Sequence, residues 1–179
     1  MITRKWNLFV ILALLFSLSS CSLFTIKSGG PSGKPNASLG AVKTFTPEIP
    51  VYQKFQCIPS SETPETGFVV DVIDGDSIKV KIGDKVFEIR YIGINTPEYY
   101  SSEKAEAELA TLENRRLVEG KKVYLFKDKS NTDKFHRLLR YVFTNEYFVN
   151  YEMVKRGSAE SKSYFPDTSC QVFFNQAAQ

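Results

Sequence analysis

The stretch GFVVDVIDGDSIKVKIGDKVFEIRYIG, residues 67–93, decides the fold of this chain. In its middle, Ile78, Val80 and Ile82 alternate with polar side chains, which is the pattern of a strand with one buried and one solvated face. A second strand-like run follows after the short turn Gly-Asp-Lys, and a third precedes the acidic triplet DGD. The stretch therefore predicts three antiparallel strands joined as a meander.

The residues after this meander predict helices and two more strands. A helix-forming run that Ser102 can cap ends before Gly120. The later elements are two strands and two short helices, at residues 122–127, 137–143, 149–157 and 168–179. Three strands, a helix and two strands is the element order of the OB-fold, a small barrel that binds oligonucleotides or oligosaccharides. We therefore predict an α+β chain, a five-stranded OB-fold β-barrel with about three helices.

The N-terminus has the pattern of an export signal. Arg4 and Lys5 precede an apolar run that ends at Phe16 and is too short to span a bilayer comfortably. The sequence LSSC follows and resembles the bacterial lipoprotein box, in which the cysteine, here Cys21, is lipidated. The alternative is an uncleaved anchor helix with an incidental cysteine. Both interpretations predict an exported chain anchored to a cell-surface or envelope membrane.

Composition divides the rest of the chain into a stalk and one domain. Residues 21–50 mix Gly, Ser, Pro and Lys without a lasting period, which favours a flexible membrane-proximal stalk. Hydrophobic residues make up 42% of the 179 positions, which suits one globular core but leaves no room for two large domains. We expect a lipoprotein signal peptide at 1–20, the stalk at 21–50 and the barrel domain at 51–179.

Charge points to a partner only through its distribution. The net charge of +3 falls when Arg4 and Lys5 leave with the signal, so overall charge says little about partners. Residues 115–140 hold nine Lys or Arg side chains against three acids, a basic stripe that is usable for phosphates. The alternative is an ordinary solvated face.

Two cysteines remain besides Cys21. Cys57 lies at the start of the globular part and Cys170 near its end. An even number of cysteines in an exported domain favours pairing, because the compartment is oxidising. We predict a disulfide between them, with two unpaired buried thiols as the alternative.

Three motifs carry the chemistry of this chain. They are VIDGDS at 72–77, RYIGINTPE at 90–98 and KFHRLLRY at 134–141. In this order and at these spacings they resemble the staphylococcal nuclease (thermonuclease) family, and the resemblance covers roughly residues 67–178.

The resemblance implies a calcium-dependent phosphodiesterase that cuts DNA and RNA, leaves 3′-phosphates and has little sequence specificity. It also implies roles for six residues: Asp76, Asn95 and the Thr96 carbonyl for the metal, Glu98 as the base, and Arg90 and Arg137 for the phosphate. These residue types suit the chemistry independently, because calcium prefers oxygen ligands and arginines donate bidentately to an anionic transition state. Asp74 and Gly75 are then turn and bulge residues that aim Asp76 at the metal.

Three further residues are candidates for nucleotide binding. In the family, a lysine and tyrosines in these regions flank the nucleotide, which implies Lys134 near a phosphate and Phe135 or Tyr164 stacked on a base. The alternative for the aromatic residues is packing against the barrel.

The chain departs from the family pattern at three places. Asn95 replaces the usual aspartate, which predicts weaker calcium binding or a changed metal preference because a charge is lost. His136 stands where glycine is common, and we interpret it as a solvent-facing loop residue. The last helix is short for the family, which predicts a less stable domain.

Two other functions remain open at this point. One is a catalytically inactive OB-fold lipoprotein that binds nucleic acid, for which Asn95 and the short last helix leave room. The other is an oligosaccharide-binding barrel, which leaves the two arginines and Glu98 unexplained. For the nuclease we expect DNA and RNA as substrates and a monomeric protein.

Overall fold

The computed structural model describes residues 49–179 except residues 60 and 101. The expected signal peptide, the expected lipidation site Cys21 and all but the last two residues of the expected stalk lie outside the described residues. Among the described residues, no helix has the length and apolar character needed to cross a bilayer.

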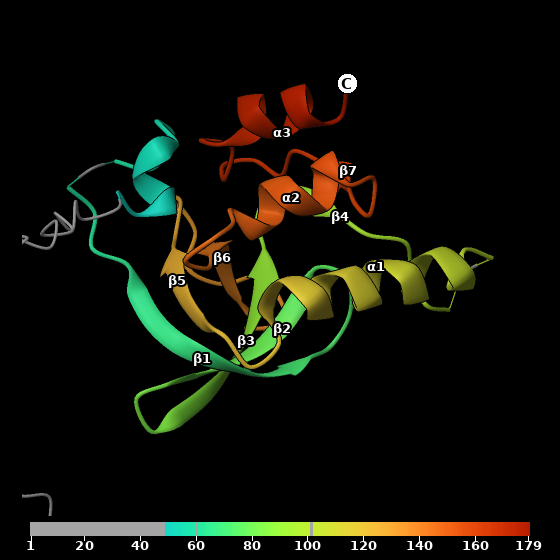
Figure 1. Cartoon of the computed structure of the whole chain (residues 1–179), viewed down its shortest axis with the longest axis horizontal. Coiled ribbons are helices and arrows are strands. Elements are labelled where there is room, and N and C mark those ends of the chain that lie inside the picture. The colour runs from blue at the N-terminus through green and yellow to red at the C-terminus, as the bar shows by residue number, and fades with distance from the viewer. Residues whose placement is uncertain (1–48, 60, 101) are drawn as a thin grey trace, which may run out of the picture. The chain divides into compact units, whose positions relative to one another are not determined.

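Five strands form a closed barrel in the order β1-β2-β3-β6-β5 (Figure 1). Their bounds are β1 (Glu65–Val72), β2 (Ser77–Ile82), β3 (Lys85–Tyr91), β5 (Lys122–Phe126) and β6 (Leu138–Phe143). Neighbouring strands are antiparallel except β3 and β6, which are parallel. A register shift between Val69 and Asp71 bends β1, which pairs with both β2 and β5.

Helices cover one side and one end of this barrel. The elements outside it are η1 (Val51–Lys54), β4 (Ile94–Asn95), α1 (Lys104–Val118), α2 (Val149–Lys155), β7 (Glu160–Ser161) and α3 (Gln171–Ala177). Helix α2 lies between the barrel and α3, and α1 lies along the side of the barrel (Figure 1). The predicted α+β fold, a five-stranded OB-fold barrel with three α-helices, is confirmed.

Two local predictions differ from the structure. Helix α1 has Glu103, and not Ser102, at its N-cap, because residues 102 and 103 still form a turn. The two-residue strands β4 and β7, in which Asn95 pairs with Glu160, were not predicted, since such short strands carry no periodic pattern.

The core is the inward face of the alternating strands together with an aromatic cluster. Ile78, Val80 and Ile89 are fully buried inside the barrel. Phe143 and Phe148 stack with their ring centroids 4.1 Å apart, and Phe55 from the N-terminal segment packs against both rings. The segment around Phe55, which precedes β1, is thus part of the core.

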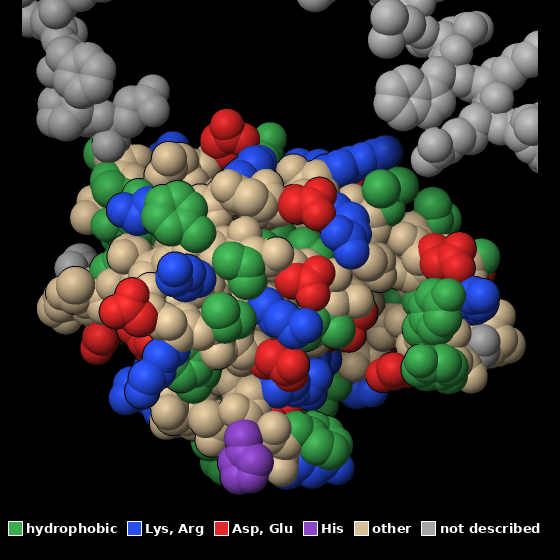
Figure 2. All heavy atoms as spheres, turned by 90° about the horizontal axis from the view of Figure 1, so that it is seen from below, with side chains coloured by type: hydrophobic (Ala, Val, Ile, Leu, Met, Phe, Trp, Pro, Cys, Tyr) green, Lys and Arg blue, Asp and Glu red, His purple; other side chains and the backbone are tan. Residues whose placement is uncertain are grey.

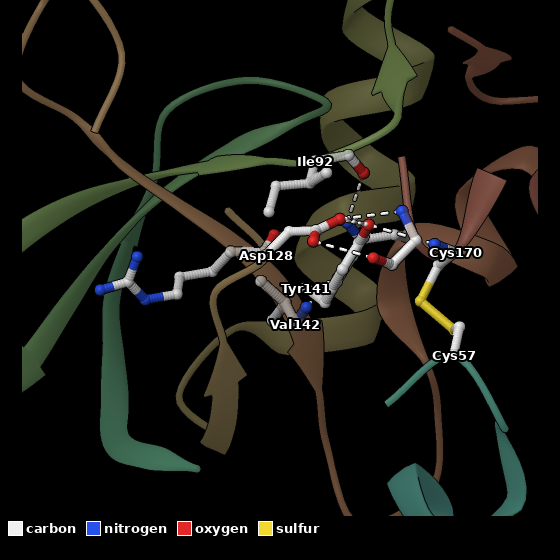
Figure 3. The surroundings of a disulfide bond; sticks show 9 residues. Cys57, Ile92, Asp128, Tyr141, Val142 and Cys170 are labelled. Atoms are coloured by element: carbon white, nitrogen blue, oxygen red, sulfur yellow. Dashed lines mark hydrogen bonds between the residues drawn. A yellow bond between two sulfur atoms is a disulfide. The ribbon is translucent and has the colours of Figure 1, made fainter. Parts of the chain in front are cut away.

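A disulfide joins this N-terminal segment to the start of α3. Cys57 and Cys170 are bonded with an S–S distance of 2.03 Å, and Cys170 is fully buried (Figure 3). Because the two residues are 113 positions apart, the bond links the beginning of the described domain to its end.

Candidate active site

The triplet DGD forms the connection between β1 and β2. The backbone N–H of Asp76 donates to Asp74 Oδ1 at 3.0 Å, so the first aspartate closes the turn. A Cβ at Gly75 would lie 2.8 Å from Ala110 Cβ, so only glycine allows α1 to approach this turn so closely. The backbone N–H groups of Ile73 and Asp74 both donate to the Ser77 carbonyl oxygen, at 3.0 and 3.3 Å, as in a bulge next to the turn, and a further register shift lies upstream in β1.

The turn places the Asp76 carboxylate in a buried, fully bonded position. Asp76 is 5% exposed. Its Oδ1 lies 3.1 Å from Arg90 Nε and accepts a hydrogen bond from Ser77 Oγ at 3.0 Å. Its Oδ2 accepts hydrogen bonds from the backbone N–H and the hydroxyl of Thr96, at 3.0 and 3.1 Å. Asp76 therefore joins the β1–β2 turn, β3 and the segment after β4.

Arg90 is held from several directions. Nη1 donates to the carbonyl oxygens of Tyr91 and Ile94, at 2.7 and 3.1 Å, and Nη2 donates to Asn95 Oδ1 at 3.3 Å. Together with the Asp76 contact, these bonds fix the plane of the guanidinium.

Arg137 pairs with Asp133 in the loop before β6, and its guanidinium lies 5.5 Å from the centre of the Phe135 ring. Asp133 Oδ2 accepts Arg137 Nε at 2.8 Å and lies 2.7 Å from Nη2. Asp133 Oδ1 accepts the backbone N–H groups of Phe135 and Arg137, at 2.9 and 3.0 Å. Desolvation alone would raise the pKa of Asp133, but these hydrogen bonds hold it below its ordinary value. The pair therefore stays ionised and bidentate.

A buried network supports the acidic turn from behind. Tyr91 donates its hydroxyl proton to Asn114 Oδ1 at 2.8 Å, and Asn114 Nδ2 donates to the Asp74 carbonyl at 2.8 Å. Burial raises the pKa of Tyr91 well above its ordinary value, which keeps the phenol a donor. Burial, followed by repulsion from Asp76, also raises the pKa of Asp74. Sequence reasoning missed Asn114, whose only signal is an amide on the buried face of a helix.

Two clefts meet at the arginines. The first, which we call the acidic cleft, has a volume of about 520 Å³. The second, which we call the aromatic cleft, has a volume of about 380 Å³. Arg90 and Arg137 line both of them. The acidic cleft is also lined by Asp74, Asp76, Thr96 and Glu98, and the aromatic cleft by Lys134, Phe135, Tyr164 and Phe165.

Asn95 takes part in the site but turns its oxygen toward the arginine. Oδ1 accepts from Arg90 and from the Tyr164 hydroxyl at 3.2 Å, while Nδ2 donates to the Thr96 carbonyl at 3.3 Å. The structure thus brings Asp76, Asn95 and Thr96 together. They are oxygen donors of the type that a hard cation prefers, but only Asp76 carries charge. Within residues 49–179, excluding 60 and 101, no three His, Cys, Asp or Glu side chains gather as a metal cluster.

His136 lines neither cleft. It is exposed, and its φ of 65° lies in the left-handed region that favours glycine. Glycine would adopt this backbone conformation without strain.

Hydrogen bonds connect the loop before β6 to the segment before α3. The acids and hydroxyls that form them were not indicated by the sequence. Asp167 Oδ1 accepts the N–H groups of Lys129 and Ser130, at 2.8 and 2.7 Å. Asp128 accepts from the backbone and hydroxyl of Ser169 and from the Tyr141 hydroxyl, each at 2.8 Å (Figure 3). Tyr141 Oη in turn accepts the Cys170 N–H at 3.2 Å, so these bonds lead to the disulfide.

The basic stripe predicted for residues 115–140 is not one surface. Arg115 and Arg116 pair with Glu119 and Glu113, and Arg140 is buried against Glu65. Figure 2 shows basic and acidic side chains interspersed on the face that it presents. Of the nine basic residues in the stripe, Lys134 and Arg137 line the clefts.

The fold and the site define a class of protein: OB-fold barrels in which turn carboxylates and two arginines face one cleft. The model of the family described as "Staphylococcal nuclease homologue" matches residues 88–178, and the chain belongs to this family. The family resemblance of the three motifs is therefore confirmed.

Similar proteins carry nuclease names. The Thermonuclease of Staphylococcus hyicus is 32% identical over 121 residues, which cover 66% of this chain and 72% of that protein. The Thermonuclease of Staphylococcus intermedius is 28% identical over 116 residues, which cover 63% and 69%. The SPbeta prophage-derived endonuclease YokF of Bacillus subtilis is 37% identical over 101 residues, which cover 54% of this chain and 34% of that protein.

Proposed function

We propose that this chain is a metal-dependent phosphodiesterase that hydrolyses DNA and RNA to 3′-phosphates with little sequence specificity. The observation that carries the proposal is the acidic cleft, where Asp76, Arg90, Glu98 and Arg137 line one cavity. Membership of the family and the nuclease names of its relatives support it.

The two arginines bind and polarise the phosphate. Both guanidiniums border the acidic and the aromatic cleft, and the planar fork of arginine matches the geometry of a phosphate. A phosphate bound between them accepts hydrogen bonds from both guanidiniums. Their positive charge stabilises the negative charge of the pentacoordinate transition state. Arg90 remains bonded to Asp76 in this arrangement, whereas Arg137 divides its donors between Asp133 and the substrate.

Glu98 is the general base of the proposed reaction. Its carboxylate lines the acidic cleft together with both arginines. It accepts a proton from the attacking water, which makes the water a stronger nucleophile.

Asp76, Asn95 and the Thr96 carbonyl are the proposed calcium ligands. Their oxygens fit a hard cation in type, and hydrogen bonds already hold the three residues together. When bound, calcium supplies positive charge that polarises the phosphate and acidifies a bound water. Because Asn95 is an amide, the site has one carboxylate less than a site with aspartate at this position. Its affinity for calcium is therefore lower.

The aromatic cleft takes one nucleotide. Phe135 and Tyr164 present ring faces for a base, and Lys134 stands beside them for a phosphate. Every base offers such a π-face, and contacts to the backbone carry no sequence information, so little selectivity follows.

The test is degradation of single-stranded DNA and of RNA with calcium, with magnesium and with chelator. Glu98→Ala and Arg137→Ala are expected to abolish cleavage, while Arg156→Ala is the matched control because Arg156 pairs with Glu113 and Glu152 outside the clefts. A folded wild-type protein that retains oligonucleotide without cleaving it would instead establish the nucleic-acid-binding module.

We also propose that the chain is exported and anchored through lipid at Cys21, and that it is a monomer. The N-terminal sequence supports the anchor, and the disulfide is of the kind found in oxidising compartments. Incorporation of labelled palmitate that persists in Cys21→Ser would contradict the anchor. Light scattering of the purified domain gives its mass and checks the monomer.

A further inference from the structure

Two neighbouring tyrosines are exposed in the segment between β4 and α1. Tyr99 is 47% exposed and Tyr100 is 98% exposed. Their ring centroids lie 5.4 Å apart at an interplanar angle of 82°, and Lys104 Nζ lies 4.9 Å from the centre of the Tyr99 ring. Packing does not explain Tyr100, whose side chain is almost completely exposed.

These tyrosines border the acidic cleft. Tyr99 and Tyr100 line the same cavity as Asp76, Arg90 and Arg137. They follow Glu98 directly in the sequence. A phosphate bound by the two arginines in the acidic cleft therefore shares its cavity with these two rings.

The aromatic cleft, which shares Arg90 and Arg137 with the acidic cleft, has a similar composition. Phe135 and Phe165 are 65% and 94% exposed there. Lys134 Nζ lies 4.9 Å from the centre of the Phe135 ring, as Lys104 Nζ does at Tyr99. An exposed aromatic pair with a lysine beside it thus stands at each of the two clefts that share Arg90 and Arg137.

We propose that Tyr99 and Tyr100 form a second base platform, which stacks the base on the side of the scissile phosphate opposite to the aromatic cleft. This inference rests on the proposed function. Aromatic faces combined with cations are the means by which proteins bind single-stranded nucleic acid without reading its sequence. The substrate is then an extended single strand with at least one unstacked base on each side of the cleaved bond, because a duplex does not offer its base faces.

The experiment couples changes in the protein to changes in the substrate. Cleavage by the full chain is measured on a short DNA strand with one preferred scissile bond, and on two strands with an abasic site on its 5′ or its 3′ side. The double variant Y99A/Y100A is expected to lose about tenfold in kcat/KM on the intact strand. On one of the two abasic strands, the double variant is expected to cleave as fast as the wild type. That strand already lacks the base that the platform would stack.

Three variants complete the design. Y99F/Y100F retains the ring faces and is expected to cleave like the wild type. Phe135→Ala is expected to slow cleavage of the intact strand but not of the other abasic strand, which lacks the base bound in the aromatic cleft. Phe68→Ala is the matched control, because Phe68 is an exposed ring on β1 that lines neither cleft.

A binding measurement separates this inference from the proposed function. Anisotropy of labelled oligothymidylate in chelator reports binding without cleavage, and Y99A/Y100A is expected to weaken it about tenfold. If the wild type cleaves but Y99A/Y100A cleaves and binds all strands equally well, the platform is refuted. If the wild type does not cleave at all, the proposed function fails, and binding alone then decides for or against the platform.

Discussion

Arg90 and Arg137 line the same two clefts, but the protein holds them in different ways. The side chain of Arg90 is 13% exposed on β3 and contacts Asp76 and the backbone carbonyls of Tyr91 and Ile94. The side chain of Arg137 is 25% exposed and is held by Asp133, four residues earlier in a loop. Loops open at lower free energy than barrel strands. The geometry of Arg90 therefore depends on the whole fold, and that of Arg137 on local contacts.

The largest expected effect is a difference in unfolding free energy between the variants Arg90→Ala and Arg137→Ala. Arg90→Ala leaves the buried Asp76 carboxylate without its charged partner, which is expected to cost about 3–5 kcal/mol of unfolding free energy. Arg137→Ala is expected to cost about 1 kcal/mol or less, because Asp133 remains partly solvated and keeps its backbone donors. Both variants are expected to lose at least about a hundredfold in activity. Urea unfolding measures the difference, and equal losses of stability would refute the comparison.

Reduction of the Cys57–Cys170 disulfide is the next effect in size. A native disulfide typically contributes about 2–4 kcal/mol, and this bond is expected at the upper end of that range because it spans 113 positions. Since Cys170 N–H bonds to Tyr141 and Tyr141 to Asp128, we expect the loop of Arg137 to loosen before the environment of Arg90 does. Hydrogen exchange with and without reductant checks this order. Equal protection of residues 127–137 in both states would contradict it.

Substitution of Asp133 tests how Arg137 is held. Asp133→Asn removes the bidentate partner and is expected to lower activity about tenfold and stability by about 1 kcal/mol at pH 7. Despite desolvation, hydrogen bonds from Arg137 and the loop backbone hold the folded-state pKa of Asp133 below its ordinary, unfolded-state value. Its stabilisation is therefore present above the unfolded-state pKa and disappears as pH falls through the folded-state pKa.

Unfolding of wild type and Asp133→Asn is therefore compared at pH 7 and near pH 3. The difference between the two proteins is expected to shrink at the lower pH. Asp128→Asn, which changes an acid outside both clefts, serves as the reference for a general loss of loop anchoring.

Asn95→Asp changes the surroundings of Arg90 rather than those of Arg137. It adds a charge next to Arg90 and Asp76 and is expected to lower the half-saturating calcium concentration about fivefold. Activity titrated with calcium measures this effect. An unchanged half-saturation would show that Asn95 does not contribute to metal binding.

The sequence predicted the barrel and its acidic cleft better than the supports of the cleft. The strands of residues 67–93 alternate with period 2, so their existence and order could be predicted. The motifs located Asp76, Arg90, Glu98 and Arg137, which the structure brings to one cavity. Asp133 and Asn114 could not be predicted as supports. Asn114 bonds to the carbonyl of Asp74, 40 positions away, and Asp133 to N–H groups of its own loop, and neither kind of bond leaves a periodic signal.

The smallest expected effect concerns His136, which lies between Asp133 and Arg137. A side chain at φ 65° strains the backbone, and glycine relieves this strain at some cost in chain entropy. His136→Gly is therefore expected to raise the unfolding free energy by about 0.5 kcal/mol. His136→Ala removes the same imidazole but keeps the strain, so it is expected to gain nothing in thermal unfolding. If alanine stabilised as much as glycine, the imidazole and not the backbone would limit how firmly this loop holds Arg137.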